Sequence, residues 1–292
     1  MKPSPFAFHR PADLHEALEV LAEVGRDGKV LAGGQSLVPL MSMRLAAPGH
    51  LVDINGLAEL GGVRVGHDGV WVGARVRHAE LERDEASHRV VPLLRQALSH
   101  VAHPTIRNRG TTVGSLVHAD PAGEMTGVLA LLGGSVRIRS TTAERLVPAN
   151  EFFLGPLESA IRPDELATEA FFPAPPPGTG SAWLEVSRRN GDYAVCGLGA
   201  LVTVDADLRI SSARVGLISV GPTPVVVDVT DVLAGQSADG ADFAAAGRQV
   251  GEGIDPQPDI HATADYRRHL ATVLTERAVR QAATVACEEV AA

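Results

Sequence analysis

The stretch "LAGGQSLVPL", residues 31–40, places two adjacent glycines directly after a short apolar run. Glycine allows positive φ and lets another group approach the main chain closely. A phosphate group needs several backbone N–H groups aimed at one point, and such a bend can provide them. Gly33 and Gly34, followed by the hydroxyl of Ser36, therefore indicate a site for one phosphate, although an ordinary chain reversal would give the same pattern.

A second glycine-containing stretch, "IRNRGTTVGSLVHADPAGE" at residues 106–124, has similar chemistry. Between Gly110 and Ser115 it combines two glycines with three hydroxyl side chains. We expect a comparable nest of backbone amides there, again with an ordinary turn as the alternative. Two such nests could hold the two phosphates of a pyrophosphate from opposite sides, provided that the fold brings them together.

The segments around the first bend predict a small α/β unit. Asp13, with Glu16 three residues later, resembles a helix capping box, and apolar residues follow at helical spacing: Leu14, Leu18 and Leu21. Farther along, alternating valines around His67-Asp68-Gly69 predict a hairpin. The expected bounds are 30–32 and 50–55 for two strands, 63–74 for the hairpin and 87–102 for a further helix.

A proline-rich stretch marks the plainest boundary in the chain. "FFPAPPPGTGS", residues 171–181, contains four prolines and two glycines and should not sustain a helix or a central strand. Beyond it, 200–221 predicts antiparallel strands, and 265–287 predicts a helix with an apolar face formed by Tyr266, Leu270, Val273 and Leu274. We therefore expect a first domain at 1–172, with lobes of about 1–57 and 58–172, a linker at 173–181 and an α+β domain at 182–292.

Composition excludes several classes of function. The chain has 292 residues, of which 45% are hydrophobic and 21% charged, and a formal net charge of −9. This charge disfavours nucleic acid as a partner, because phosphate-backbone binding needs clustered Lys and Arg. No apolar run approaches the roughly eighteen residues of a membrane span. The first residues lack the apolar segment of a secretory signal, so a cytoplasmic location is expected.

Cofactor chemistry based on metals or on common nucleotide motifs is not expected from this chain alone. Only Cys196 and Cys287 occur, whereas an iron–sulfur cluster normally takes four thiolates. The histidines show no metal-ligand spacing. "CGLGALV" at 196–202 lacks the third glycine and the βαβ context of a dinucleotide fingerprint. We therefore predict no metal site and no Rossmann-type site.

Three segments together carry a family resemblance: "AGGQSLVPLMSMRL", "HPTIRNRGTTVGSLVHADPAGE" and "EVSRRNGDYAVCGLGA". Their order and distances resemble those in the FAD-binding medium subunit of the molybdenum hydroxylases, the group containing aerobic carbon monoxide dehydrogenase and xanthine dehydrogenase. The resemblance spans nearly the whole chain. It implies an α+β fold, with a two-lobed FAD-binding domain of the PCMH (vanillyl-alcohol-oxidase-like) type and a C-terminal α+β domain that has an antiparallel sheet and helices.

The resemblance also implies a non-covalent FAD site. Residues 32–36 and 111–115 would form two pyrophosphate loops, Glu124 would contact the ribityl or neighbouring groups, and Tyr193 would come near the isoalloxazine. Arg107 and Arg109 are expected to be structural, and no catalytic residue is predicted. The implied cofactor-binding residues are Val30, Leu31, Ala32, Gly33, Gly34, Gln35, Ser36, Leu37, Val101, Thr111, Thr112, Val113, Gly114, Ser115, Glu124, Leu166, Ala167, Asp192 and Tyr193.

One position departs from the family pattern. The family usually has Gly-Gly-Ser where this chain has Val113-Gly114-Ser115. A β-branched residue resists positive φ. We therefore expect either an extended Val113 or a loop that lies slightly farther from the phosphate.

The implied function is that of an electron-transfer subunit. It would take electrons from a partner 2Fe-2S subunit and pass them to an external acceptor, while a large subunit carries the molybdenum cofactor; a dimer of heterotrimers is the expected assembly. One alternative is a stand-alone FAD-dependent oxidoreductase that acts on a small molecule without metal-containing partners. A second alternative is a non-enzymatic scaffold whose loops no longer hold FAD. The substrate and the final electron acceptor are not encoded in these motifs.

Overall fold

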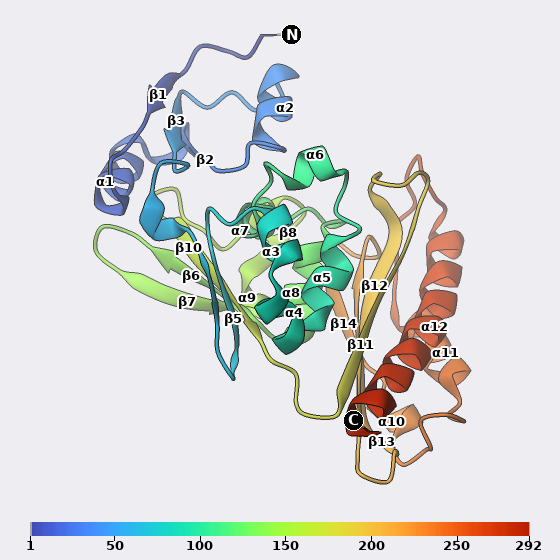
Figure 1. Ribbon diagram of the computed structural model, residues 1–292. Coiled ribbons are helices and arrows are strands. Elements are labelled where there is room, and N and C mark those ends of the chain that lie inside the picture. The colour runs from blue at the N-terminus through green and yellow to red at the C-terminus, as the bar shows by residue number, and fades with distance from the viewer. Residues whose placement is uncertain (1, 292) are drawn as a thin grey trace.

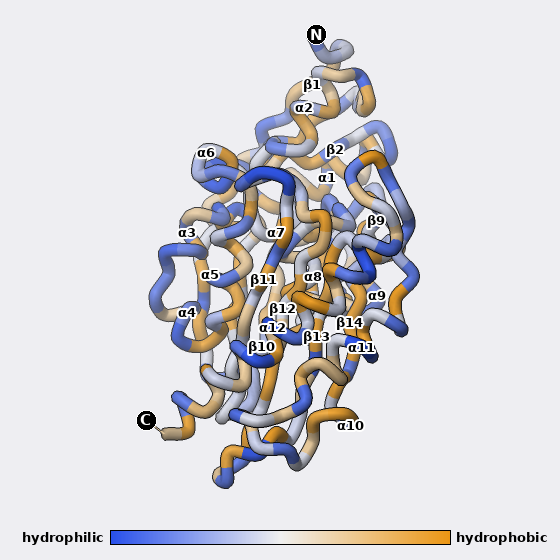
Figure 2. The backbone as a smooth tube through the Cα atoms, turned by 90° about the vertical axis from the view of Figure 1, so that its right-hand side faces the viewer, coloured by the Kyte–Doolittle hydropathy of each residue, from blue (hydrophilic) through white to orange (hydrophobic). Residues whose placement is uncertain are grey.

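The computed structural model describes residues 2–291. Its N-terminal lobe stands at one end of the molecule in both overall views (Figures 1 and 2). The lobe has a parallel three-stranded sheet in the order β1-β3-β2. Asp13 accepts a hydrogen bond from the backbone N–H of Glu16 and caps the first helix, as the sequence predicts. The elements are β1 (Ala7–His9), α1 (Leu14–Val24), β2 (Gly28–Leu31), α2 (Leu37–Ser42) and β3 (His50–Asp53).

The second lobe contains an antiparallel five-stranded sheet in the order β4-β5-β10-β6-β7, with helices packed beside it. The predicted hairpin forms its edge as β4 and β5. The strands are β4 (Val63–Val65), β5 (Gly69–Gly73), β6 (Ser135–Arg139), β7 (Glu144–Pro148) and β10 (Leu166–Pro173), and a separate hairpin is formed by β8 (Phe153–Gly155) and β9 (Glu158–Ser159). The helices are α3 (His78–Arg83), α4 (Glu85–Val90), α5 (Pro92–Leu98), α6 (Pro104–Arg107), α7 (Thr112–His118), α8 (Glu124–Leu132) and α9 (Ala149–Phe152).

The single helix predicted over residues 87–102 is wrong. The chain forms two helices there, α4 and α5, which meet at Val91, a residue with φ −135°. Pro92 explains the break, because a proline disfavours helical geometry in the residue before it and is tolerated at the first position of a new helix. The apolar residues Leu94 and Leu98 remain on one buried face. The apolar spacing therefore indicates helical structure correctly but does not reveal the break before Pro92.

The C-terminal region has an antiparallel four-stranded sheet in the order β11-β12-β13-β14, followed by helices, as predicted. Helix α12 covers one face of this sheet, and α8 and α5 of the first domain lie against the other (Figure 1). Strand β12 is therefore buried along almost its whole length. The elements are β11 (Thr179–Ser187), β12 (Ala194–Val204), β13 (Ile210–Ile218), β14 (Val225–Asp228), α10 (Thr230–Leu233), α11 (Phe243–Gly253) and α12 (Ala264–Ala291).

Packing explains the glycines of the "CGLGALV" segment. A Cβ built on Gly199 would lie 3.0 Å from side-chain atoms of both Leu131 in α8 and Trp183 in β11. Trp183 and Ile218 belong to the same hydrophobic core as α8 and the second lobe. The two parts of the chain thus share one core, and Gly199 allows α8 to approach the sheet closely.

Two further details differ from the sequence-based expectations. Strand β10 continues through Phe171 to Pro173, and β11 begins at Thr179, so only 174–178 of the proline-rich stretch lies outside strands. Pro173 is tolerated because it is the last residue of its strand. Tyr266, expected on the buried face of α12, is 48% exposed, whereas Leu270 and Leu274 are buried.

Candidate functional site

The two glycine-containing bends are in direct contact. A Cβ built on Gly33 would lie 2.5 Å from the carbonyl oxygen of Arg109, 2.7 Å from the Cα of Gly110 and 3.0 Å from the backbone nitrogen of Thr111. Real Cβ atoms do not approach backbone atoms so closely, so this contact requires glycine at position 33. The fold therefore joins two segments that are far apart in the sequence into one site.

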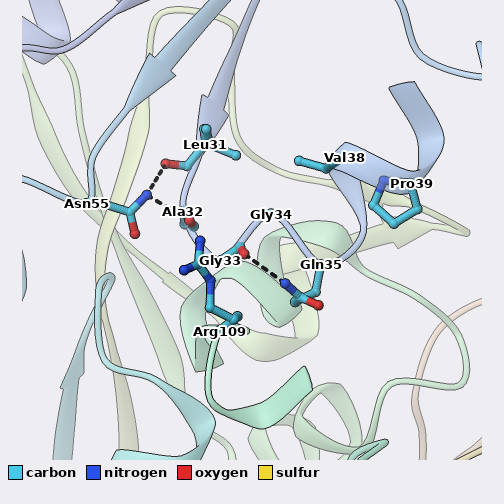
Figure 3. Close-up of a pocket in the computed structure, with 9 residues that line it drawn as sticks. All are labelled: Leu31, Ala32, Gly33, Gly34, Gln35, Val38, Pro39, Asn55 and Arg109. Atoms are coloured by element: carbon cyan, nitrogen blue, oxygen red, sulfur yellow. Dashed lines mark hydrogen bonds between the residues drawn. The ribbon is translucent and has the colours of Figure 1, made fainter. Parts of the chain in front are cut away.

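A cavity of about 330 Å³ opens beside this contact (Figure 3). Backbone of the first bend forms most of its wall, and Arg109 reaches toward Ala32 and Gly33 from the second segment. Gly34 has φ +72°, a conformation that side-chain-bearing residues rarely adopt. The lining residues are Leu31, Ala32, Gly33, Gly34, Gln35, Val38, Pro39, Asn55 and Arg109.

Two side chains outside the predicted set hold the bends in place. The Asn55 amide donates hydrogen bonds to the carbonyl oxygens of Leu31 (3.3 Å) and Ala32 (2.9 Å). Arg77 donates one hydrogen bond to the side-chain oxygen of Asn55 and another to the carbonyl oxygen of Arg109. Arg77 thus connects both bends through a single guanidinium group.

The second bend differs from the predicted nest of three hydroxyl groups. The Thr111 hydroxyl accepts a hydrogen bond from the N–H of Gly114 and so caps α7, while the Thr112 hydroxyl is fully buried and contacts Nδ1 of His78 at 3.2 Å. Burial holds the pKa of His78 down to about 4, and nearby Arg107 contributes to the lowering. Ser115 remains partly exposed beside the bend.

Val113 is not extended, which corrects the first of the two expectations for this position, while the distance of the loop from the phosphate stays a prediction. Val113 lies in the first turn of α7, with its side chain 1% exposed in the core. A helix has negative φ, so the β-branched side chain causes no backbone strain there. Gly114, the next residue, lies close to the first bend, because a Cβ built on it would be 3.9 Å from the Cβ of Ala32.

Positive charge gathers on the Arg109 side of the cavity. Burial lowers the pKa of Arg77, and the positive charges of Arg109 and Arg75 lower it further. The carboxylates of Glu80 and Asp53 offset part of this crowding of like charge, and an added anion would offset more of it. A pyrophosphate beside these guanidinium groups would provide that compensation, so the charge pattern and the backbone cradle suit the same ligand group.

The C-terminal domain reaches the site through its β11–β12 loop. A Cβ built on Gly191, which has φ +84°, would lie 2.4 Å from the imidazole ring of His103 in the first domain. Asp192 and Tyr193 follow directly, and the Tyr193 side chain is 71% exposed. Partial loss of hydration raises the pKa of Tyr193, as do the carboxylates of Asp120 and Glu124.

Of the remaining predicted residues, Val30, Ser36 and Leu37 are partly exposed beside the first bend, whereas the other four lie inside the protein. Val101, Leu166 and Ala167 are 8%, 2% and 6% exposed and belong to the main hydrophobic core. Glu124 begins α8 and is 9% exposed. The structure brings Glu124 close to the second bend, since a Cβ built on Gly123 would lie 3.8 Å from the hydroxyl oxygen of Ser115.

Asn55 and Arg77 were missed at the level of sequence. Asn55 directly follows a predicted strand, which is a common position for a functional polar side chain, and this signal was available. Arg77 had no comparable signal, because its two partners lie 22 and 32 residues away along the chain.

Known protein families match nearly the whole chain. Residues 4–175 match the family described as the FAD binding domain in molybdopterin dehydrogenase, and residues 181–282 match the CO dehydrogenase flavoprotein C-terminal domain. No helix within residues 2–291 has the length and apolarity needed to cross a membrane.

Three similar proteins illustrate the relationship. The 6-hydroxypseudooxynicotine dehydrogenase complex subunit alpha of Paenarthrobacter nicotinovorans is 38% identical, over 97% of this chain and 96% of its own length. The caffeine dehydrogenase subunit beta of Pseudomonas sp. strain CBB1 is 39% identical over the same shares. A chain of quinoline 2-oxidoreductase from Pseudomonas putida 86 superimposes with a TM-score of 0.93 at 35% identity, over 98% of this chain and 99% of that one. The chain therefore belongs to the FAD-binding medium subunits of the molybdopterin dehydrogenase family, the flavoprotein subunits of molybdenum-containing oxidoreductases.

Proposed function

We propose that this chain binds FAD non-covalently across the two bends, takes electrons from a partner 2Fe-2S subunit and passes them to an external acceptor. The observation that carries the proposal is the contact of Gly33 with the backbone of residues 109–111, which joins two glycine-containing segments into one cradle. When bound, FAD supplies the redox chemistry, while the protein supplies position, electrostatics and access. No side-chain acid, base or nucleophile is required.

The chain's own residues divide this work. We infer that residues 32–36 and 111–115 hold the diphosphate mainly through backbone N–H groups, because the hydroxyls of Thr111 and Thr112 are already engaged within the protein. Flanking contacts would come from Val30, Leu31 and Leu37. Glu124, Asp192 and Tyr193 would contact the ribityl and isoalloxazine parts, with Val101, Leu166 and Ala167 as apolar support from the core side.

The proposal extends to partner subunits. Relatives carry names such as "complex subunit alpha" and "subunit beta", which supports a multi-subunit assembly for this chain as well. We infer a small iron–sulfur subunit and a large subunit with the molybdenum cofactor, arranged as a dimer of heterotrimers in the cytoplasm. Purification at native expression levels tests this inference: metal analysis should find iron and molybdenum with the chain, in addition to flavin. A yellow, catalytically active chain without these partners would contradict it.

A single substitution tests the shared cradle. Gly33→Ala places a methyl group 2.5 Å from the Arg109 carbonyl oxygen, and a backbone atom cannot rotate away as a side chain can. We expect FAD affinity to fall by at least ~100-fold, a loss of roughly 2.7 kcal/mol. Gly56→Ala is the matched control, because a Cβ on Gly56 meets no atom within 4 Å. Unchanged FAD affinity in a folded Gly33→Ala protein would show that the two bends do not form one cofactor site.

A further inference from the structure

Two carboxyl groups lie at the junction between α8 and the C-terminal sheet. Glu124 is the first residue of α8, and its side chain is 9% exposed. Within residues 2–291 no hydrogen bond from another residue reaches its carboxylate, and its own backbone N–H gives the charged form only a minor stabilisation. A nearly buried carboxyl group with so few donors is costly to ionise.

The second carboxyl group, that of Glu185, comes from β11 in the other domain. It accepts a hydrogen bond from the Trp183 indole N–H at 3.4 Å. The same indole packs against α8, because a Cβ built on Gly127, one turn after Glu124, would lie 3.1 Å from its ring. Trp183 therefore connects Glu185 with the helix that carries Glu124.

The charges around this pair are mostly negative. Burial raises the pKa of Glu124 to about 8, with further contributions from the charges of Glu185 and Asp120. Tyr193 also lies near Glu124. Arg107 is the cation that faces Glu124, but its guanidinium is bound to the Glu82 carboxylate at 2.8 Å and to two backbone carbonyl oxygens.

Glu185 has a similar environment. Burial raises its pKa to about 7, against a smaller lowering by the Trp183 hydrogen bond. The Cys196 thiol of β12 lies in the core on the opposite face of the sheet, and burial raises its pKa to about 12, so it adds no charge near neutral pH. Around neutral pH, two adjacent carboxyl groups with raised pKa values titrate as a pair.

We propose that Glu124 and Glu185 form a proton-holding pair at the wall of the FAD site, which takes up a proton when negative charge enters the site and releases it when that charge leaves. The inference rests on the proposed function, because it requires FAD beside Glu124. Contacts link the pair to the cradle: Glu124 follows Gly123, which approaches Ser115, and Gly114 approaches Ala32.

The physical basis is electrostatic. A negative charge near a carboxyl group favours the protonated form of that group, and this interaction is strong in a site with little water. Electrons that arrive at the cofactor would therefore draw a proton from solvent onto a carboxylate oxygen of the pair. This uptake compensates the added charge without any covalent step, and onward transfer of the electrons reverses it.

Proton counting tests the pair directly. The purified holoprotein, with the partner subunits it carries, is reduced anaerobically in weak buffer from pH 6 to 9, and protons taken up are measured with an indicator dye. We expect Glu124→Gln/Glu185→Gln to take up about one proton fewer per pair of electrons than wild type near pH 7.5. Glu252→Gln, at an exposed position of α11, is the control and should match wild type.

Single variants keep the test decisive if the double variant loses FAD. Glu185→Gln leaves Gly123 and its approach to Ser115 untouched. Removing the Glu185 charge should lower the pKa of Glu124, which shifts the pH range of proton uptake downward. If FAD-loaded variants take up as many protons as wild type, the proposal that Glu124 and Glu185 hold this proton is wrong. Wild-type protein that binds no FAD would instead overturn the proposed function, so the two failures are distinguishable.

Discussion

The two glycine-containing bends that meet at Gly33 are built by different means. The first, 31–40, depends on glycine: Gly33 permits a backbone contact and Gly34 has φ +72°. The second, 110–115, is the capped beginning of α7, with Thr111 bound to the N–H of Gly114. The first bend contains no ionisable side chain, whereas the second is followed by the buried Glu124. A cradle can thus be built from one strained loop and one ordinary helix start.

The largest effect should come from the side chain that serves both bends. Arg77→Ala removes hydrogen bonds to Asn55 and to the Arg109 carbonyl oxygen. We expect a loss of about 3 kcal/mol in the free energy of unfolding, together with weaker FAD binding, because two partly buried acceptors lose a charged donor. Urea titration measures the first effect. Arg83→Ala, at an exposed arginine of α3, is the control. An equal loss of unfolding free energy in this control would contradict the role of Arg77 in connecting the two bends.

The next effect concerns pH and should arise only at the second bend. The pKa of Glu124 is about 8 in the folded chain, so the folded state retains a proton that the unfolded chain releases near pH 4.5. The free energy of unfolding should therefore fall as pH rises from about 4.5 to 8, by an amount on the order of a few kcal/mol. Glu124→Gln should flatten this part of the profile. A profile that is equally steep in the variant would contradict the raised pKa.

A smaller effect is expected at the first bend. Gly34→Ala forces a side chain into positive φ and places its Cβ 3.3 Å from both Leu31 and Val38. The strain should cost about 1–2 kcal/mol of stability and weaken FAD binding. Thermal unfolding and FAD titration measure the two effects, with Gly56→Ala as the matched control. A neutral result would mean that the first bend relaxes without strain.

The smallest effect should come from the helix cap. Thr111→Val removes the hydroxyl that accepts from Gly114 while keeping the shape of the side chain. Loss of such a cap costs about 1 kcal/mol, and FAD affinity should change less than in Gly34→Ala. Thr105→Val, at an exposed position in α6, should leave the unfolding midpoint unchanged. A larger loss of FAD in Thr111→Val than in Gly34→Ala would reverse the ranking of the bends.

Local patterns in the sequence predicted the elements of the cradle better than its conformation. Gly33 and Gly34 stand next to each other after a strand, so the first bend was visible. At the second bend the glycines suggested a turn, whereas the chain begins a helix there. Thr111 is a good N-cap residue and Val113 fits a helix, so the sequence did contain a signal for this helix start. Pro92 also indicates a helix break, which the apolar spacing alone does not reveal.

Contacts between residues that are far apart in the chain could not be predicted from the sequence. The Asn55–Arg77 brace and the approach of Glu185 to Glu124 depend on how separate lobes and domains pack, and no local spacing encodes such contacts. Burial of Val101, Leu166 and Ala167 was similarly not deducible from their position in a motif.

Trp183 and Ile218 share a hydrophobic core with α8. This shared core determines whether a truncated chain can remain folded. A fragment ending near residue 175 would leave the sheet-facing sides of α5 and α8 uncovered, and apolar surface of that extent promotes aggregation. Heating the intact protein should give one calorimetric peak for both halves, since neither half can lose its structure without stripping the other of its cover.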